Sequence, residues 1–347
     1  MYEPKYNLTD VMIMEISELE QNKTRLDLAE FTSQTYKELM KKSKSVNMFH
    51  LAHMIGVDLT IKDAEKAIEG KKISTNDARG IVLNNFRSAM EFVRSDVTET
   101  HLELDINLLL HLNKIMLTEW KEVWEAKLRI DSNDVDTSID NWIQLRNKEI
   151  TMFELEGKVG EVIFWFKTNQ GRIHPLIRLA VLIYELIRIA PFSHLNQITI
   201  ITLVDLLLFK NGYLAQTFLP IVRELDMHNQ ENVSLWEKIA AENDYTNWIE
   251  RFIQNLNASI KEDREKILGL VSSSKGNNKQ PFLDLNRRQL KILRYLQTIP
   301  TVKREDYVQM MDVSTMTAFR DLTDLVEKKL LKVDGRGRGT KYLLVNR

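Results

Sequence analysis

The 347-residue sequence contains no cysteine and has only 6 proline and 12 glycine residues. Without cysteine the chain can form neither disulfides nor thiolate metal sites, which excludes a disulfide-stabilised scaffold and is consistent with a reducing compartment. Because proline and glycine are the strongest helix breakers, their scarcity leaves room for long helices.

The chain also lacks a long uninterrupted apolar run. Its most apolar region, residues 173–209, is broken by Arg178, Glu185, Arg188, Pro191, His194 and Asn196. A membrane helix needs about 20 consecutive apolar residues, so we expect no membrane span. The first residues, Met-Tyr-Glu-Pro-Lys-Tyr-Asn, offer neither the basic nor the apolar part of a signal peptide. We therefore expect a cytoplasmic protein without a membrane partner.

Apolar residues recur at helical spacing through the first 270 residues, for example at Phe86, Met90 and Val93. The fold class expected is therefore mainly α. Residues 173–189 are apolar nearly all round, which predicts a central buried helix. The β-branched run Ile198–Thr202 has strand propensity and is ambiguous on composition alone.

Charge divides the chain into two parts. Residues 285–347 hold 14 Lys/Arg against 7 Asp/Glu, a net charge of +7, whereas residues 1–284 carry −8. The stretch Ser272–Pro281 has the composition of a flexible linker and separates the two parts. A basic module on an acidic body favours contact with nucleic acid, and the alternative is an ordinary fluctuation of surface charge.

The basic module predicts three helices and a hairpin. A first helix begins at the capping residue Asn286 and places three leucines on one face, Leu290, Leu293 and Leu296. A second helix is expected near residues 303–311, and Ser314 caps a third that continues to Lys328. The glycine-rich residues 334–345 read as a turn and strand, the wing of a winged helix.

Residues 189–201 read Ile-Ala-Pro-Phe-Ser-His-Leu-Asn-Gln-Ile-Thr-Ile-Ile. The run resembles the Fic family signature H-P-F-x-D/E-G-N-G-R-x-x-R, matching it at Pro191, Phe192 and Asn196. Fic proteins typically transfer AMP or another phosphate-linked group from a nucleotide to a protein hydroxyl. The resemblance extends to the flanking segments 173–189 and 202–213, and to Asn84–Ala89. It implies a mainly α, Fic-type helical domain followed by a small winged helix-turn-helix domain.

The positions that carry the family's chemistry differ in this chain. Alanine replaces the catalytic histidine, histidine replaces the metal carboxylate, and apolar or bulkier residues replace the glycines and arginines, at Ala190, His194, Leu195, Gln197, Ile198 and Ile201. A positioned base contributes about 10²–10⁴ in rate, and alanine accepts no proton. Imidazole is a poor Mg²⁺ ligand, and isoleucine cannot hold phosphate as arginine does.

The resemblance therefore implies no catalytic residue, no metal site and no cofactor, with ATP and Mg²⁺ relevant only if residual activity exists. Asn196 is the one remaining candidate for contact with a nucleotide phosphate. Residues 119–150, which hold Trp120, Trp124 and Trp142, correspond to the flap that binds the target peptide in the family. A protein or peptide partner in that groove is accordingly a further expectation.

The C-terminal module resembles the winged helix-turn-helix often found at the end of Fic proteins, through Asn286-x-Arg288-Gln289, Val313-Ser314-x-x-Thr317-Ala318-x-Arg320-Asp321-Leu322 and Gly337-Arg338-Gly339-Thr340-x-Tyr342. In DNA-binding versions the third helix enters the major groove. The predicted base readers are Ser314, Thr315, Thr317 and Arg320. The predicted phosphate contacts are Arg336, Arg338 and Lys341. The alternative is a module that docks a protein or forms a homodimer.

We expect four segments: residues 1–95 as the N-terminal helical region of the Fic module, 96–270 as its core, 271–283 as a linker, and 284–347 as the winged helix-turn-helix domain. The leading hypothesis is a catalytically degenerate Fic-fold protein that regulates by binding, with DNA contacted through the C-terminal domain. The alternatives are residual protein AMP transfer from ATP and a purely protein-interaction role.

Overall fold

The computed structural model describes residues 2–27, 33–99, 103–131, 134–136, 138–139, 150–213, 221–226, 229–274, 285–299, 301–328, 330–335 and 340–345. It divides into two compact units, Met1–Asp27 with Leu39–Ile267 and Leu28–Glu38 with Leu268–Arg347. We call the first unit the body, and residues 285–347 of the second the C-terminal domain.

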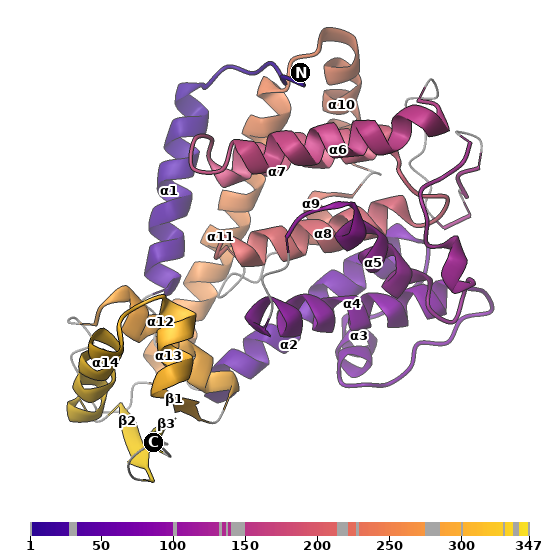
Figure 1. Ribbon diagram of the computed structural model, residues 1–347. Coiled ribbons are helices and arrows are strands. Elements are labelled where there is room, and N and C mark those ends of the chain that lie inside the picture. Colours follow the sequence, from indigo (N-terminus) through magenta and orange to yellow (C-terminus); the bar gives the residue numbers. More distant parts are fainter. Residues whose placement is uncertain are drawn as a thin grey trace. The chain divides into compact units, whose positions relative to one another are not determined.

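The described part of the body is helical, which confirms the mainly α prediction (Figure 1). Its helices are α1 Asp10–Asp27, α3 Ile61–Ile68, α4 Arg79–Glu99, α5 Ile106–Leu117, α6 Met152–Thr168, α7 Pro175–Ile189, α8 Asn196–Lys210, α9 Ile221–Glu224 and α10 Gln230–Glu242, with a 3-10 turn η1 at Val123–Glu125. Two more helices belong to the body for most of their length, α2 Ser33–Met54 from Leu39 onward and α11 Thr246–Ser274 as far as Ile267. No helix in the described ranges is long and apolar enough to cross a membrane.

Helix α7 is the central buried helix that the sequence predicts. It begins with Pro175 at its first turn, where the missing N–H costs nothing, after an N-cap at His174. Thirteen of its fifteen residues are buried, including the charged Arg178 and Glu185. The Arg178 guanidinium donates to the carbonyl oxygens of Phe166 at 2.6 Å and Ile173 at 3.2 Å, so the buried cation retains partners.

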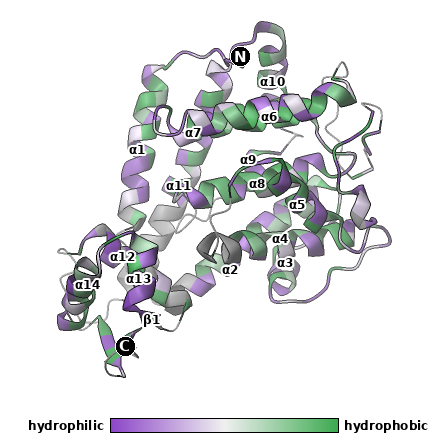
Figure 2. Cartoon of the chain, viewed as in Figure 1, coloured by the Kyte–Doolittle hydropathy of each residue, from purple (hydrophilic) through white to green (hydrophobic). Residues whose placement is uncertain are grey.

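Helix α8 resolves the ambiguity of Ile198–Thr202 in favour of helix. All residues from Asn196 to Leu208 are buried, and α8 packs against α4, α5 and α7. The hydroxyls of Thr199 and Thr202 donate to carbonyl oxygens one turn earlier, at 2.7 and 2.9 Å, so β-branched polar residues remain satisfied within a helix. Figure 2 shows hydrophobic colour along most of α8. Tertiary burial thus overrides local strand propensity here.

The C-terminal domain contains α12 Arg287–Thr298, α13 Arg304–Met311 and α14 Thr315–Glu327 together with β1 Val302–Lys303, β2 Leu331–Asp334 and β3 Lys341–Leu344. The strands form an antiparallel sheet in the order β1-β3-β2, with Tyr342 facing both Val302 and Val333 across the ladders. The predicted caps at Asn286 and Ser314 are confirmed, and the helix-turn-helix with a following hairpin matches the expected winged architecture.

The buried face of α12 differs in part from the leucine face that the sequence predicts. Ile292 and Leu296 are the buried core residues, and Leu293 is only partly buried against them. The side chain of Leu290 lies outside the described residues. At 100° per residue, positions 289, 292 and 296 share one side of the helix, and Gln289 there is also buried.

Helix α11 extends through Ser274, four residues into the linker expected at 271–283. The remainder of that linker, residues 275–283, lies outside the described ranges. The segment boundaries at 95 and 270 therefore stay predictions from the sequence.

Candidate functional site

The loop between α7 and α8 begins and ends with residues in the left-handed conformation. Ala190 has φ 46° and Leu195 has φ 55°, and neither is glycine. This conformation costs roughly 1–2 kcal/mol for a residue with a Cβ atom. Leu195 therefore follows the backbone path that a glycine would take, but its side chain fills space there and is buried.

The buried side chain of Asn196 stabilises the loop by hydrogen bonds to its backbone. Its side-chain oxygen accepts a hydrogen bond from Phe192 N at 2.8 Å, and its amide nitrogen donates to Phe192 O at 2.7 Å. The residue is fully buried. Contact between Asn196 and a nucleotide phosphate stays a prediction. In the structure the side-chain amide bonds to the Phe192 backbone and stabilises the turn.

A segment from the predicted flap pairs with the loop and covers it. Leu128 forms an antiparallel bridge with Phe192, and Arg129 N donates to Pro191 O at 2.9 Å. Further along, Asp136 N donates to Ser193 O at 2.8 Å. The loop backbone is therefore engaged by Leu128, Arg129 and Asp136. Trp142, which the sequence places in the same flap, lies outside the described residues.

Arg129 is the functional-site residue that sequence reasoning missed. Its guanidinium is completely buried and donates to three carbonyl oxygens, those of Ala190 at 2.9 Å, Ile189 at 3.2 Å and Ile150 at 3.4 Å. Two of these carbonyls are at the C-terminal end of α7, where the helix dipole favours a cation. A lone arginine in an irregular segment carries no sequence signal for this role.

We predict that Arg129→Met lowers the free energy of unfolding by about 2–4 kcal/mol, because buried carbonyl oxygens lose their donors. Urea unfolding followed by circular dichroism measures the change. Lys127→Met is the matched control, since Lys127 is exposed and its replacement should change stability by less than about 0.5 kcal/mol. Equal stability of the two variants would contradict the role assigned to Arg129.

His194, which occupies the family's metal-carboxylate position, is held between two carboxylates. Its Nδ1 lies 3.2 Å from Asp136 Oδ2 and its Nε2 lies 3.3 Å from Glu125 Oε2. Trp120 packs edge-on at 5.7 Å between ring centroids. Burial tends to raise the pKa of Asp136, but hydrogen bonds from Ser138 and the neighbouring His194 hold it below its usual value. Both ring nitrogens of His194 are thus occupied by protein partners.

The residues at the loop do not fit ATP with Mg²⁺. Ala190 offers no base, Ile198 and Ile201, which the resemblance aligns with phosphate-binding arginines, are buried and apolar, and Asn196 at the α8 N-terminus is fully buried. Among the described residues, no group of three or more His, Asp or Glu side chains is arranged to hold a metal ion.

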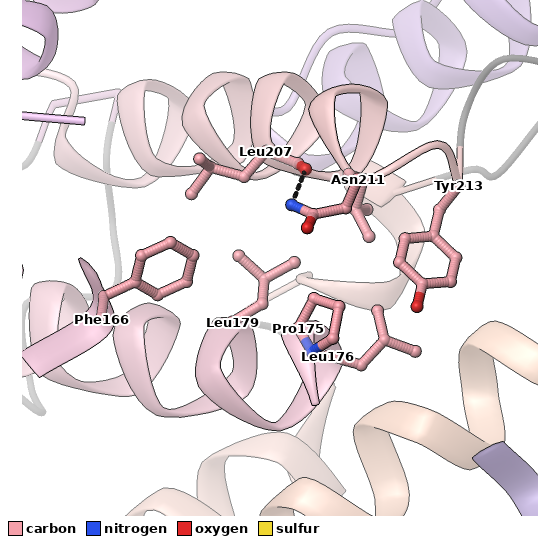
Figure 3. A pocket seen from close by; sticks show the side chains of 8 residues that line it. Phe166, Pro175, Leu176, Leu179, Leu207, Asn211 and Tyr213 are labelled. Carbon is pink, nitrogen blue, oxygen red and sulfur yellow. Dashed lines mark hydrogen bonds between the residues drawn. The ribbon is translucent and has the colours of Figure 1, made fainter. Parts of the chain in front are cut away.

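A narrow, mostly apolar pocket with no room for a water molecule lies elsewhere, between the end of α6, the start of α7 and the end of α8 (Figure 3). Asn211 on its wall donates its amide to Leu207 O at 2.7 Å, the bond drawn as a dashed line. Pro175 is at the opposite end of α7 from Ala190, about 22 Å away for a 15-residue helix. The pocket therefore does not serve the loop.

In the C-terminal domain, α14 carries the predicted base readers. Thr315 and Arg320 are exposed. Ser314 is the N-cap, where its hydroxyl accepts from Thr317 N at 3.2 Å and lies 3.0 Å from the Thr317 hydroxyl. Ser314 and Thr317 thus already have a capping role, which leaves Thr315 and Arg320 as the more available pair. Lys341 is exposed on β3, whereas Arg336 and Arg338 lie outside the described residues.

Asp321 fixes the orientation of α14. It accepts hydrogen bonds from Asn286 Nδ2 at 2.8 Å, Arg288 Nε at 2.7 Å and Tyr307 Oη at 2.9 Å. Burial tends to raise the pKa of this carboxyl, but the three donors outweigh burial and lower it. The motif residues of the module therefore join α12, α13 and α14 at one carboxylate.

Sequence reasoning also missed two apolar residues on α14. Met316 is 61% exposed and Phe319 is 44% exposed. The Arg304 guanidinium lies 4.9 Å from the centre of the Phe319 ring. A helical wheel places Met316 opposite the buried Ala318, Leu322 and Leu325, and Phe319 at the flank of that buried face.

Comparisons with known proteins match the C-terminal domain and the whole chain to different sets of proteins. Residues 288–339 match the DeoR-like helix-turn-helix domain family. No curated protein matches the chain.

Solved structures similar to the chain include a Fic family protein from Desulfovibrio desulfuricans G20, with a TM-score of 0.57 and 14% identity over 100% of this chain and 99% of that one. A Fic domain containing signaling protein from Bacteroides thetaiotaomicron VPI-5482 has a TM-score of 0.56 and 15% identity, covering 76% of this chain and 100% of its own.

Fic-1 from C. elegans gives a TM-score of 0.56 and 14% identity, covering 76% of this chain and 74% of that one. Identities this low establish a shared fold and leave activity open. The chain therefore has the fold of Fic proteins and carries a DeoR-like helix-turn-helix domain near its C-terminus.

Proposed function

We propose that this chain is a catalytically degenerate Fic-fold protein that acts as a DNA-binding regulator through its C-terminal domain. The observation that carries the proposal is the DeoR-like helix-turn-helix at residues 288–339, within a segment of net charge +7. Helix-turn-helix domains place the second helix of the motif, which is α14 in this chain, in the major groove of DNA. Exposed Thr315 and Arg320 support base contact from that helix.

The state of the loop supports the loss of transferase activity. The groups that would accept a proton, hold Mg²⁺ and bind phosphate are replaced, and Leu128, Arg129 and Asp136 bond to the backbone of Pro191, Phe192 and Ser193. We accordingly propose that the protein uses neither ATP nor Mg²⁺ as a cofactor. The body would then serve as a structural scaffold. As a secondary proposal, it binds a protein or peptide in the groove that holds the target in Fic proteins.

A homodimer is the arrangement that suits the proposed DNA contact. Two copies of α14 would read half-sites about one helical turn apart, which predicts a palindromic operator. We place this function in the cytoplasm, in keeping with the absence of cysteine.

The test is binding of the full chain to duplex DNA, measured by fluorescence anisotropy at low salt. Selection from a randomised duplex pool should yield a recurrent sequence. Failure to bind any duplex at 50 mM salt would contradict the proposal.

A further inference from the structure

The outward face of α14 combines apolar and basic side chains. Buried Ala318, Leu322 and Leu325 direct one side of the helix into the domain core. Met316, 61% exposed, lies on the opposite side together with the exposed Arg320, and Phe319, 44% exposed, lies at the flank between the two sides. An exposed pair of large apolar side chains on the first turns of such a helix is informative, because water is a poor environment for both.

Phe319 is held in place on that face. The Arg304 guanidinium, from the first residue of α13, stacks on its ring at 4.9 Å. A cation over an aromatic face is attractive and restricts how far the ring can turn. The Phe319 ring is therefore partly exposed to solvent with a positive charge beside it. This arrangement suits a partner that has an apolar group close to negative charges, as the bases and phosphates of DNA do.

We infer that Met316 and Phe319 read the 5-methyl groups of thymine in the major groove, an inference that rests on the proposed DNA-binding function. Among the four bases only thymine presents a methyl group there, and apolar side chains contact it. Residues of the first turns of α14 are those that reach base edges. Arg320, beside them, has the geometry to pair with guanine O6 and N7.

The charges around the pair favour DNA over a protein partner. Arg304 and Arg320 lie next to the apolar residues, and the segment that contains them has a net charge of +7. An apolar protein surface would gain nothing from these cations. The inference therefore commits to a duplex with thymine in each half-site, within reach of α14.

The experiment uses the full chain and the duplex selected from the randomised pool. Each thymidine is replaced in turn by deoxyuridine, which removes only the methyl group and keeps base pairing and charge. At one or two positions the unmodified protein should lose about 4-fold in affinity, which corresponds to ~0.8 kcal/mol for one buried methyl group. Phe319→Ser or Met316→Ser should bind the two duplexes equally at the position that its side chain contacts.

Phe153→Ser is the matched control, because Phe153 is 90% exposed on α6 of the body. This variant should keep the full preference for thymidine. Unchanged circular dichroism of Phe319→Ser confirms that the exposed substitution leaves the domain folded.

Three outcomes overturn the inference. If the unmodified protein binds its selected duplex but shows no loss at any deoxyuridine position, methyl readout is wrong and the proposed function stands. The same holds if Phe319→Ser and Met316→Ser retain the preference for thymidine at every position. If no duplex is selected at all, both fail, and capture of a protein by this face becomes the better account.

Discussion

Raising the salt concentration from 50 to 200 mM should weaken binding of the full chain to duplex DNA by on the order of 40-fold. Each phosphate that a lysine or arginine neutralises contributes about −0.9 to the slope of log affinity against log salt. Three contacts, from Arg336, Arg338 and Lys341, predict a slope of about −2.7. Anisotropy titrations at five or more salt concentrations measure it.

The charge-matched variants are Lys341→Gln in the C-terminal domain and Lys238→Gln on α10 of the body. Both lysines are exposed, so neither change should disturb the fold. Lys341→Gln should reduce the magnitude of the slope by about 0.9, and Lys238→Gln should leave it unchanged. A slope near zero, or equal effects of the two variants, would show that the C-terminal domain is not the DNA contact.

Replacing Ala190 by histidine should leave nucleotidyl transfer undetectable and should destabilise the protein. A base alone contributes about 10²–10⁴ in rate and cannot act without groups that bind phosphate and metal. Ala190 is fully buried with φ 46°, so an imidazole must enter a packed interior from a strained backbone. Overpacking of this kind costs about 1–3 kcal/mol, which urea unfolding will measure.

Ala241→His on α10 serves as the control, since Ala241 is exposed and its replacement should change stability by no more than about 1 kcal/mol. Transfer of label by Ala190→His but not by the unmodified chain would mean that the rest of the site still supports chemistry. That result would show that the missing histidine alone accounts for the absence of activity.

Local signals in the sequence were sufficient for α7 and for the caps of the C-terminal domain, whereas Ile198–Thr202 of α8 was ambiguous without its tertiary burial. Asn286 and Ser314 are capping residues whose side chains bond to nearby backbone N–H groups, so a short window of sequence determines them. The sequence of α7, apolar nearly all round the helix, likewise predicts a buried helix by itself.

The closure of the loop could not be predicted in this way. Arg129 acts on carbonyl oxygens of α7 that are 60 and 61 residues away in the chain, and Leu128 pairs with Phe192 across a similar separation. Such contacts depend on the tertiary fold, and the segment that makes them has no periodicity. The two carboxylates around His194 were missed for the same reason.

The structure also gives a physical reason why three motif residues match while the others do not. Asn196 bonds twice to the Phe192 backbone, Phe192 is buried and bridges to Leu128, and Pro191 O accepts from Arg129 N. These positions shape the loop. The replaced positions are those to which the resemblance to the Fic signature assigns the chemistry, and none of them makes the hydrogen bonds between Asn196 and Phe192.

The most direct test of the central claim is label transfer by the unmodified chain. Purified protein is incubated with Mg²⁺ and ATP labelled at the α-phosphate, alone and with a cell lysate, beside an active Fic protein as positive control. The loop described above predicts no incorporation beyond that of a sample without the protein. Robust, Mg²⁺-dependent labelling of the chain or of a lysate protein would contradict it and identify the protein as an enzyme.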